Sequence, residues 1–388
     1  MECHAWVVTI PIGKWNKAGC KHLRSTHPEL VRKIGDEGYL NPEHPGTAPY
    51  LAKICAEITR NYDIDGIHLD YIRYPENATS FPDAQTYRRY GGGKQKAAWR
   101  SDNITRIVRS IHRDVKALKP WVKVSSSPIG KYADVSRFSA KGWNARDAVH
   151  QDAQGWLREG IHDMLFPMMY FDGNHFYPFA ADWAEHTYGR IIAPGLGIYF
   201  LHPAEKNWPL GNVVRQLHYI RSLKLGGQCY FRSQFLTSDV KGLYSYLQRD
   251  FYAYPALPLP CTWIDSVPPS APGQLTMRIA AHDCAVLSWL PSTDNSRGGV
   301  RYNVYASAEN PVDISRAENL MATGLPETAY TFNPTVAYTC SLHFAVTAMD
   351  RCGNESPAVQ LSTSLNQGKA DKRTLHLGTK GQLIFSSN

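Results

Sequence analysis

The sequence of 388 residues lacks the features that define several classes of protein. None of its eight cysteines belongs to a Cys-x-x-Cys pair, so neither a zinc ribbon nor a thioredoxin-type redox site has support. It contains no apolar run of about eighteen residues, the length that a membrane-spanning helix needs. Apolar residues make up 43% and charged residues 20%, which excludes a disordered chain. A coiled coil, a small disulfide scaffold and a collagen-like chain are excluded as well.

Several catalytic and binding signatures are also missing. The sequence has no Gly-x-Ser-x-Gly elbow, and residues 91–94 (GGGK) lack the spacing and the following Ser or Thr of a phosphate loop. Residues 195–197 (GLG) lack the third glycine of a dinucleotide fingerprint. No third ligand at a useful spacing joins His4 and His68, so we expect no metal and no cofactor. The first ten residues show neither a basic region nor a cleavage site, so no signal peptide is visible.

What the sequence does contain is a regular alternation of strand and helix patterns up to about residue 253. Short apolar runs rich in β-branched and aromatic residues predict buried strands at 3–10, 66–72, 122–129, 163–171, 191–200 and 226–233. Helical patterns lie near 46–61, 94–118, 150–160, 178–187, 209–224 and 238–250. This order predicts a parallel α/β sheet.

The pattern changes after a proline-rich stretch at 254–272, which predicts a semi-rigid linker and a domain boundary. Residues 284–290, 301–307 and 341–349 alternate apolar and polar side chains with a period of two. We therefore expect a small all-β sandwich over 273–365, with Trp289 buried in its core. Residues 366–388 form a tail with no assigned structure.

Several segments resemble the glycosyl-hydrolase-like barrel family known as family 10 glycosylhydrolase. The most specific is DGIHLDYIRYP at 65–75, and the others are HAWVV at 4–8, GYLNPEHP at 38–45, SSSPIG at 125–130 and QDAQGWLREGIHDMLFPMMYF at 151–171. The resemblance covers residues 1–253, and its motifs fall in order at the ends of predicted strands. The second domain resembles a bacterial fibronectin type III module, on LSW at 287–289, YNVY at 302–305 and AVTAMDRCGNES at 345–356.

The resemblance implies a (β/α)8 TIM-type barrel in the first domain. Family barrels have eight strands, and HAWVV normally belongs to the third, whereas only six strands are counted here. The first two βα units are therefore expected to be missing. Many members also carry a Pro-Gln pair where this sequence has Pro167-Met168, so the polar environment of the sixth strand differs. The resemblance further implies a secreted or periplasmic parent protein.

A barrel of this type carries its active site at the carboxyl ends of its strands. In residues 66–70, Ile67 and Leu69 share one face, while His68 and Asp70 share the other, with Asp70 last. A carboxylate in that position is costly unless it is paired or functional. We predict a catalytic Asp70; the alternative is a salt bridge from Asp70 to Arg73 that holds the strand end.

The same alternation along residues 163–171 places Asp172 at the end of that strand, which corresponds to the sixth strand of the family barrel. Glycosidases use two carboxylates that flank the scissile bond, and we take Asp70 and Asp172 as the candidate pair. The alternative is that Asp172 is the turn residue of an Asp-Gly pair. The sequence does not say which carboxylate is the acid. Polar and aromatic residues at strand ends are the candidate substrate-binding set: His4, Trp6, His68, Arg73, Tyr170, His175, Tyr199 and Arg232.

These residues favour a glycoside hydrolase that cleaves O-glycosidic bonds in an oligo- or polysaccharide, such as a cell-wall glycan. The alternative is a non-catalytic glycan-binding protein, because an incomplete barrel could hold a glycan without cleaving it. A third reading, a nucleic-acid binder, would use Arg106, Arg109, Arg113 and Lys116 on the helix at 94–118, but a solvated basic face is the commoner explanation. We expect a carbohydrate partner, no nucleic acid and no membrane span. The oligomeric state is not predicted.

Overall fold

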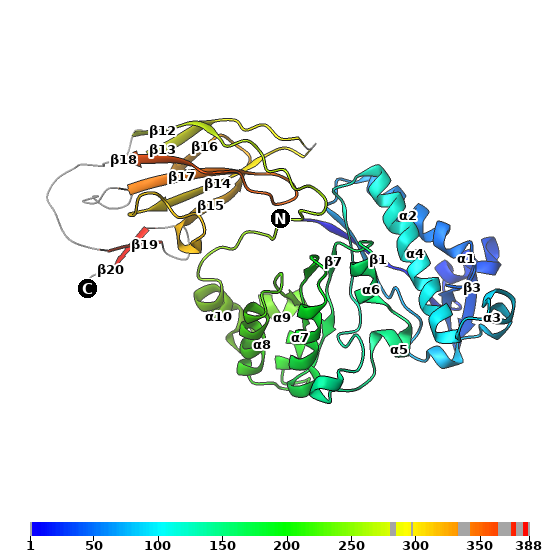
Figure 1. Ribbon diagram of the computed structural model, residues 1–388. Helices are drawn as coiled ribbons and strands as arrows, with labels where there is room; N and C mark the ends of the chain where they lie inside the picture. Colours follow the sequence, from blue (N-terminus) through cyan, green and yellow to red (C-terminus); the bar gives the residue numbers. More distant parts are fainter. Residues whose placement is uncertain are drawn as a thin grey trace. The chain divides into compact units, whose positions relative to one another are not determined.

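The structure is a computed structural model that describes residues 2–279, 285–295, 298–332, 342–363, 374–377 and 383–386. It divides into two compact units, residues 1–241 and 242–388, which are described separately below (Figure 1).

The first unit is built on six parallel strand paths that follow one another in chain order. They are β1 (His4–Val8), β5 (Gly66–Asp70), β6 (Lys123–Ser126), β7 with β8 (Met164–Leu165, Met168–Met169), β9 with β10 (Ile191–Ile192, Gly195–Leu196) and β11 (Cys229–Tyr230). The strands pair in the order β1-β5-β6-β7-β9 and, further along, β8-β10-β11. All six strands predicted from the sequence are thus confirmed, and their parallel pairing makes a mixed α/β fold.

Two of the paths are each interrupted by a proline. Pro167 separates β7 from β8 and Pro194 separates β9 from β10, and proline has no N–H to give to a strand ladder. Their carbonyls still accept hydrogen bonds from the next strand, from Gly195 N at 2.7 Å and from Cys229 N at 2.9 Å. Each path therefore continues through its proline toward the carboxyl end of the sheet.

Helices connect these strands and cover one face of the sheet (Figure 1). They are α2 (Thr47–Asn61), α4 (Lys96–Leu118), α5 (Ala145–Val149), α6 (Ala153–Arg158), α7 (Tyr177–Glu185) and α8 (Leu210–Ser222). Ile67 and Leu69 of β5 are fully buried, as are Ile104, Ile107 and Ile111 of α4. The predicted division of β5 into a helix-facing side and an opposite side is confirmed.

The helix predicted at 238–250 is wrong as a single element. The structure has α9 (Ser233–Thr237), a 3-10 turn (Val240–Gly242), α10 (Leu243–Tyr246) and a π-helical turn (Leu247–Phe251). Lys241 and Gly242 have φ angles of +51° and +78°, which are left-handed and end any α-helix at this point.

A small insertion between β1 and α2 was not predicted. It contains β2 (Pro11–Lys14), α1 (Ala18–Thr26), β3 (Val31–Ile34) and β4 (Glu37–Leu40), and its strands form an antiparallel sheet in the order β2-β4-β3. Because this insertion follows the carboxyl end of β1, it lies at the end of the sheet where a parallel α/β fold places its active site. A further short helix, α3 (Ala84–Tyr90), lies in the connection from β5 to α4.

The described part of the second unit has two larger antiparallel sheets and one separate pair of short strands. One has β12 (Gly273–Ile279), β13 (Ala285–Leu290) and β16 (Ala329–Phe332); the other has β15 (Leu320–Leu325), β14 (Arg301–Ser307), β17 (Leu342–Met349) and β18 (Val359–Thr363). Side chains from both sheets share one apolar core, in which Trp289 is 5% exposed, as predicted. Residues 284 and 341 of the predicted strands lie outside the described residues. So does most of the tail at 366–388, whose described parts, β19 (Thr374–Leu377) and β20 (Leu383–Ser386), pair antiparallel.

Candidate active site

The candidate site is centred on Asp70, the last residue of β5. Strand pairing aligns Asp70 with Val8 and His68 with Trp6 of β1. The Trp6 indole Nε1–H donates to Asp70 Oδ2 at 3.1 Å, and the Tyr71 N–H donates to Asp70 Oδ1 at 2.8 Å. Both carboxylate oxygens are thus oriented from neighbouring residues. The Trp6 side chain is 67% exposed, so its ring is open to a ligand while its N–H fixes Asp70.

The backbone turns sharply directly after Asp70. Tyr71 has a φ of +52°, a left-handed conformation that costs a residue with a Cβ about 1–2 kcal/mol. This turn aims the Tyr71 N–H back at the Asp70 carboxylate. Non-glycine residues in this conformation persist where the surrounding structure enforces them, and they cluster at functional sites.

Burial raises the pKa of Asp70, and the hydrogen bonds from Tyr71 and Trp6 and the charge of Arg73 only partly oppose it. The ion pair of Arg73 is with Glu76 Oε1, at 3.7 Å, and none with Asp70 is found within residues 2–279. The alternative in which a salt bridge to Arg73 explains Asp70 is therefore not supported. The geometry favours a carboxyl group that carries a proton more readily than an ordinary aspartate does.

A pocket of about 470 Å³ begins beside Asp70, at Tyr71, and extends to the inserted sheet. Arg73, 6% exposed, lies on its wall, with its guanidinium 5.1 Å from the Tyr71 ring and 5.9 Å from the Trp143 ring. Across the pocket, the Tyr39 hydroxyl donates to Glu37 at 2.8 Å. The lining residues are Val8, Pro11, Ile34, Glu37, Tyr39, Tyr71, Arg73, Tyr74, Pro75, Glu76 and Asn77.

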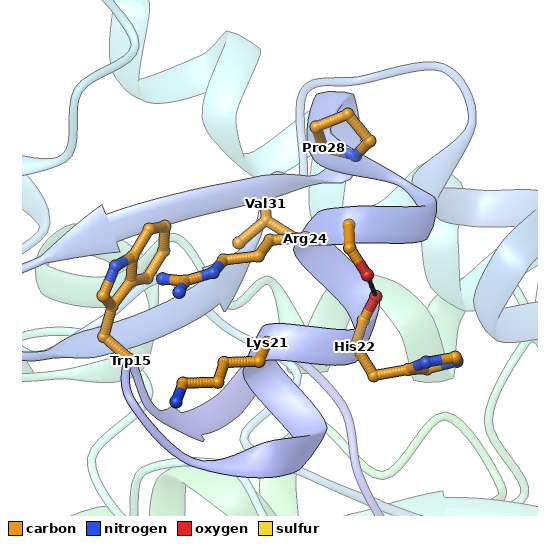
Figure 2. A pocket seen from close by; sticks show the side chains of 7 residues that line it. Trp15, Lys21, His22, Arg24, Pro28 and Val31 are labelled. Atoms are coloured by element: carbon orange, nitrogen blue, oxygen red, sulfur yellow. Dashed lines mark hydrogen bonds between the residues drawn. The ribbon is translucent and has the colours of Figure 1, made fainter.

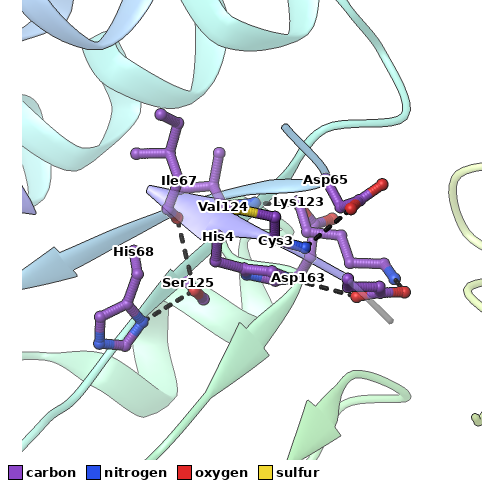
Figure 3. A network of polar contacts seen from close by, with 10 residues as sticks. Cys3, His4, Asp65, Ile67, His68, Lys123, Val124, Ser125 and Asp163 are labelled. Carbon is purple, nitrogen blue, oxygen red and sulfur yellow. Dashed lines mark hydrogen bonds and ion pairs between the residues drawn. The ribbon is translucent and has the colours of Figure 1, made fainter. Parts of the chain in front are cut away.

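His68 lies on the same face of β5 as Asp70, one step deeper. Its Nδ1 lies 3.0 Å from the Ser125 hydroxyl (Figure 3), and its Nε2 lies 2.9 Å from the Ser127 hydroxyl, so both ring nitrogens are engaged. Burial, assisted by the charge of His4, lowers the pKa of His68 to about 4, which leaves the ring neutral at pH 7. His68 is therefore suited to hold β5 and β6 in register beneath Asp70.

His4 lies at the opposite, amino-terminal end of the strands. Its Nε2 is 3.1 Å from Glu2, which also pairs with Lys123. Gly66 stands opposite His4, and a Cβ at Gly66 would lie 2.3 Å from the His4 ring, so only glycine leaves room for it. The structure therefore places His4 in a polar cluster away from the strand end that carries Asp70.

Aromatic rings from three other strand ends form a cluster, and one of them, Tyr170, interacts with Asp70. Tyr170 follows β8 and is within electrostatic reach of Asp70 and Tyr71. Its ring stacks on Phe231 at 5.2 Å with an interplanar angle of 20°, and Tyr199 lies edge-on 6.0 Å from each of them. Phe231 is 46% exposed, so this cluster offers an open ring face. The sequence predicted Tyr170 and Tyr199 as site residues but not Phe231, which follows the last strand directly before Arg232.

Asp172 makes different contacts from Asp70. Its Oδ1 accepts from Gly173 N at 2.7 Å, and its Oδ2 accepts from Asn212 Nδ2 of α8 at 2.7 Å. The first bond is the Asp-Gly turn contact of the alternative interpretation, and the second joins the strand end to a helix. Asp172 and Asp70 share no hydrogen-bond partner among these contacts.

The two remaining predicted residues have aromatic or basic partners of their own. His175 Nδ1 lies 2.7 Å from the ammonium of Lys131, a side chain that is 6% exposed. The Arg232 guanidinium lies 5.5 Å from the Phe235 ring at the start of α9. Within the described residues, neither forms a hydrogen bond or an ion pair with Asp70.

A buried carboxyl that sequence reasoning missed is Glu43, in the GYLNPEHP segment. Glu43 is 2% exposed, and burial, together with the charge of Asp83, raises its pKa to about 7. The Tyr74 hydroxyl donates to it at 3.4 Å, and Asp83 pairs with Arg100 at 2.5 Å. The only sequence signal was a carboxylate between two prolines beside a predicted helix start, which does not distinguish a buried from an exposed side chain.

The basic side chains of α4 have intramolecular partners. Arg109 pairs with Glu159 at 2.6 Å, Arg113 with Asp114 at 2.7 Å and Lys116 with Asp163 at 2.8 Å. Arg106 donates to the Pro42 carbonyl at 2.9 Å. These contacts favour the interpretation of this face as an ordinary basic helix surface over a phosphate-tracking one.

The part of the chain that the structure describes contains no group of three or more His, Cys, Asp or Glu side chains placed to hold a metal ion. Nor does any described helix combine the length and the apolar character needed to cross a membrane.

Residues 1–195, half of the chain, match the model of a protein family described as glycosyl hydrolase-like 10. Glycosyl hydrolase YngK of Bacillus subtilis (strain 168) is 27% identical over 393 residues, covering 94% of this chain and 75% of that protein. Glycosyl hydrolase DigH of Escherichia coli (strain K12) is 26% identical over 287 residues, and the chain spans 64% of its length. Among solved structures, the glycoside hydrolase domain of PgaB (BpsB) from Bordetella bronchiseptica has a TM-score of 0.42 and 14% identity, covering 63% of this chain and 73% of that chain.

Proposed function

Because the chain belongs to the glycosyl hydrolase-like 10 family, we propose that it hydrolyses O-glycosidic bonds of an oligo- or polysaccharide, with Asp70 as the proton donor. The observation that carries this proposal is the setting of Asp70 at the carboxyl end of β5. There its carboxyl is partly buried and oriented by two N–H donors, its neighbour Tyr71 lines a polar pocket, and its charge acts on Tyr170 of the aromatic cluster.

The role of proton donor follows from the pKa of Asp70. A leaving sugar oxygen is a poor leaving group unless it receives a proton, and the donor must hold that proton near the working pH. Burial raises the pKa of Asp70 and so increases the protonated fraction. Trp6 and Tyr71 keep the carboxyl in one orientation, because each donates to a different oxygen.

For the second carboxylate we propose Asp172, at the end of the strand path that carries Tyr170. The Gly173 N–H and the Asn212 amide fix its two oxygens, as a nucleophile or base requires for orientation. The competing role, a turn residue that anchors α8, predicts a different outcome. Asp172→Asn then lowers the melting temperature and leaves the turnover rate unchanged, whereas the catalytic role predicts a loss of turnover in a folded protein.

The aromatic residues supply the binding surface. The open indole of Trp6 and the ring of Phe231 offer flat apolar faces, and Tyr170, Tyr199 and Arg73 add hydrogen-bond donors. Flat rings with polar edges match sugar rings, which have apolar faces and polar edges. Cell-wall glycan is the substrate that we propose to test first.

The test compares three forms of the full chain on purified cell-wall glycan strands, with soluble products separated by chromatography. Asp70→Asn keeps the size of the side chain and one of its two acceptor oxygens, replaces the other oxygen with an NH2 group, and cannot donate the acid proton. Asp65→Asn is the matched control, because Asp65 lies at the other end of β5, where its carboxylate accepts from the Cys3 N–H at 2.8 Å. We expect products from the wild type and the control and none from Asp70→Asn. Products from all three forms would remove Asp70 from the mechanism.

The proposal includes a closed eight-stranded barrel, with two further βα units between β11 and β1. Among the described strands, β1 pairs only with β5 and β11 only with β10, so each presents one unpaired edge. Exposed edges promote aggregation and are usually covered. Reading the gene in frame upstream of the Met1 codon tests this part: an open frame through two βα units supports it, and an immediate stop codon contradicts it.

For the second unit we propose a fibronectin type III-like sandwich that acts as a spacer. Its support is the pairing of a three-stranded and a four-stranded antiparallel sheet around the core that contains Trp289.

A further inference from the structure

A second hollow of about 730 Å³ lies on the insertion between β1 and α2 and shares no lining residue with the pocket beside Asp70. Its lining comes from the turn after β2, from α1, from the 3-10 turn Pro28–Leu30 and from the start of β3: Trp15, Lys21, His22, Arg24, Ser25, Pro28 and Val31. Figure 2 shows that Lys21 and Arg24 extend from α1 toward Trp15, whereas the His22 ring points the other way.

The charge in this hollow is positive and is not neutralised from within the insertion. Residues 11–40 contain six Lys or Arg but only three Asp or Glu. These three acids are engaged elsewhere: Glu29 pairs with His27 at 3.6 Å, while Asp36 and Glu37 both pair with Lys14 at 3.0 Å. Within residues 2–279, no ion pair involves Lys21 or Arg24.

Trp15 orients the Arg24 guanidinium. The guanidinium carbon lies over the indole, 4.4 Å from the ring centre, within the range of a cation–π contact (Figure 2). Stacking occupies the flat face of a guanidinium and leaves its N–H edge free for the two oxygens of a carboxylate or phosphate. The ammonium of Lys33 also lies near this ring, with its Nζ 5.5 Å from the ring centre. Lys33 interacts electrostatically with Asp36.

We propose that this hollow binds a carboxylate or phosphate group of an anionic polysaccharide, with Arg24 as the bidentate donor and Lys21 as the second cation. Because the insertion lines both hollows, one extended chain held by Arg24 and Lys21 can be presented to the pocket beside Asp70. That the ligand is a glycan rests on the proposed function; the anionic character rests on the hollow alone.

The test measures binding by calorimetry at low salt, on the full chain carrying Asp70→Asn so that no turnover is needed. Oligogalacturonate supplies carboxylates, poly(glycerol phosphate) supplies phosphates, and chitotetraose is the neutral probe. The test variant carries Lys21→Gln and Arg24→Gln in addition to Asp70→Asn. Its charge-matched control adds Lys53→Gln with Arg60→Gln, two exposed cations of α2.

We expect at least one anionic probe to bind the parent and the control equally and the test variant at least tenfold more weakly. Which probe binds distinguishes carboxylate from phosphate. A third variant, Trp15→Leu, removes the platform but no charge and should weaken binding several-fold. The proposal is overturned if neither anionic probe binds, if the test variant binds like its parent, or if chitotetraose shows the same loss. A wild-type chain that binds but releases no products contradicts the hydrolase proposal and leaves this one standing.

Discussion

The indole N–H of Trp6 donates to Asp70 Oδ2 across the β1–β5 pair, at 3.1 Å. This bond lowers the pKa of Asp70 and so opposes the effect of burial. The same residue presents an open ring, 67% exposed, so one side chain both tunes the candidate acid and offers a surface for a sugar.

Trp6→Phe should therefore raise the pKa of Asp70 further, because it removes the donor but keeps a ring. A general acid works only while it is protonated, so the basic limb of the pH profile of kcat/KM should move to higher pH. Trp6→Ala should show the same displacement together with a higher KM. A basic limb that stays in place in Trp6→Phe would show that this hydrogen bond does not control the catalytic proton.

The left-handed turn at Tyr71 predicts a difference between two substitutions. Tyr71→Ala and Tyr71→Gly both remove the ring, but only alanine keeps the Cβ that is strained at a φ of +52°. The glycine variant should be more stable than the alanine variant by about 1 kcal/mol, measured as the free energy of unfolding in urea. Equal stabilities would mean that the turn relaxes when the ring is lost.

The buried carboxyl of Glu43 predicts a pH dependence of stability. Its pKa in the folded protein is about 7, above the ordinary value of 4.5, so the folded state holds this proton more tightly than the unfolded state does. The stabilisation is complete below the unfolded pKa and is lost as the pH rises through about 7.

Wild-type stability should thus fall by up to roughly 3 kcal/mol between pH 4.5 and pH 7.5 on account of this group, at 1.36 kcal/mol per pKa unit. Glu43→Gln should flatten that dependence, whereas Glu57→Gln, at an exposed position of the adjoining helix α2, should leave it unchanged. Urea unfolding at several pH values measures both, and parallel curves for the wild type and Glu43→Gln would contradict the assignment.

Trp289 predicts a stability effect in the second unit. It is 5% exposed and packs edge-on against Tyr302 at 5.4 Å. Trp289→Ala should cost about 3–5 kcal/mol of unfolding free energy, while Leu290→Ala, at a side chain that is 50% exposed, should cost little. Turnover per folded molecule should be unchanged in both. An unaltered unfolding curve for Trp289→Ala would exclude the tryptophan as a core residue.

Sequence patterns predicted what depends on local periodicity. The six strand paths, the helix-facing side of β5 and the burial of Trp289 follow from apolar spacing, and the structure confirms them. The inserted sheet escaped prediction because its strands have four residues each and mixed polarity. The helix break at Lys241 and Gly242 was not predicted, because the left-handed conformation of a lysine does not change the hydrophobic pattern of the sequence.

In the candidate site, too, local patterns predicted some features and not others. Alternation along β5 selected Asp70, and its position at the strand end is confirmed. Alternation shows which face of a strand a residue lies on but not how far along the strand it lies. For this reason His4, at the amino end of β1, was grouped with residues at the carboxyl ends of the strands. It also could not show that Asp172 meets Asn212, forty residues later in the chain, or that Glu43 is buried, because both depend on packing between distant segments.

The central claim is that Asp70 gives a proton to the leaving oxygen. The most direct measurement is kcat/KM of the wild type and Asp70→Asn on aryl glycosides of the sugar that the chain cleaves, with leaving-group pKa values of about 4 and about 10. We predict that Asp70→Asn loses on the order of 10³-fold on the poor leaving group, which needs the proton, and little on the good one. An equal loss on both substrates, or no loss on either, would contradict the role of Asp70 as the acid.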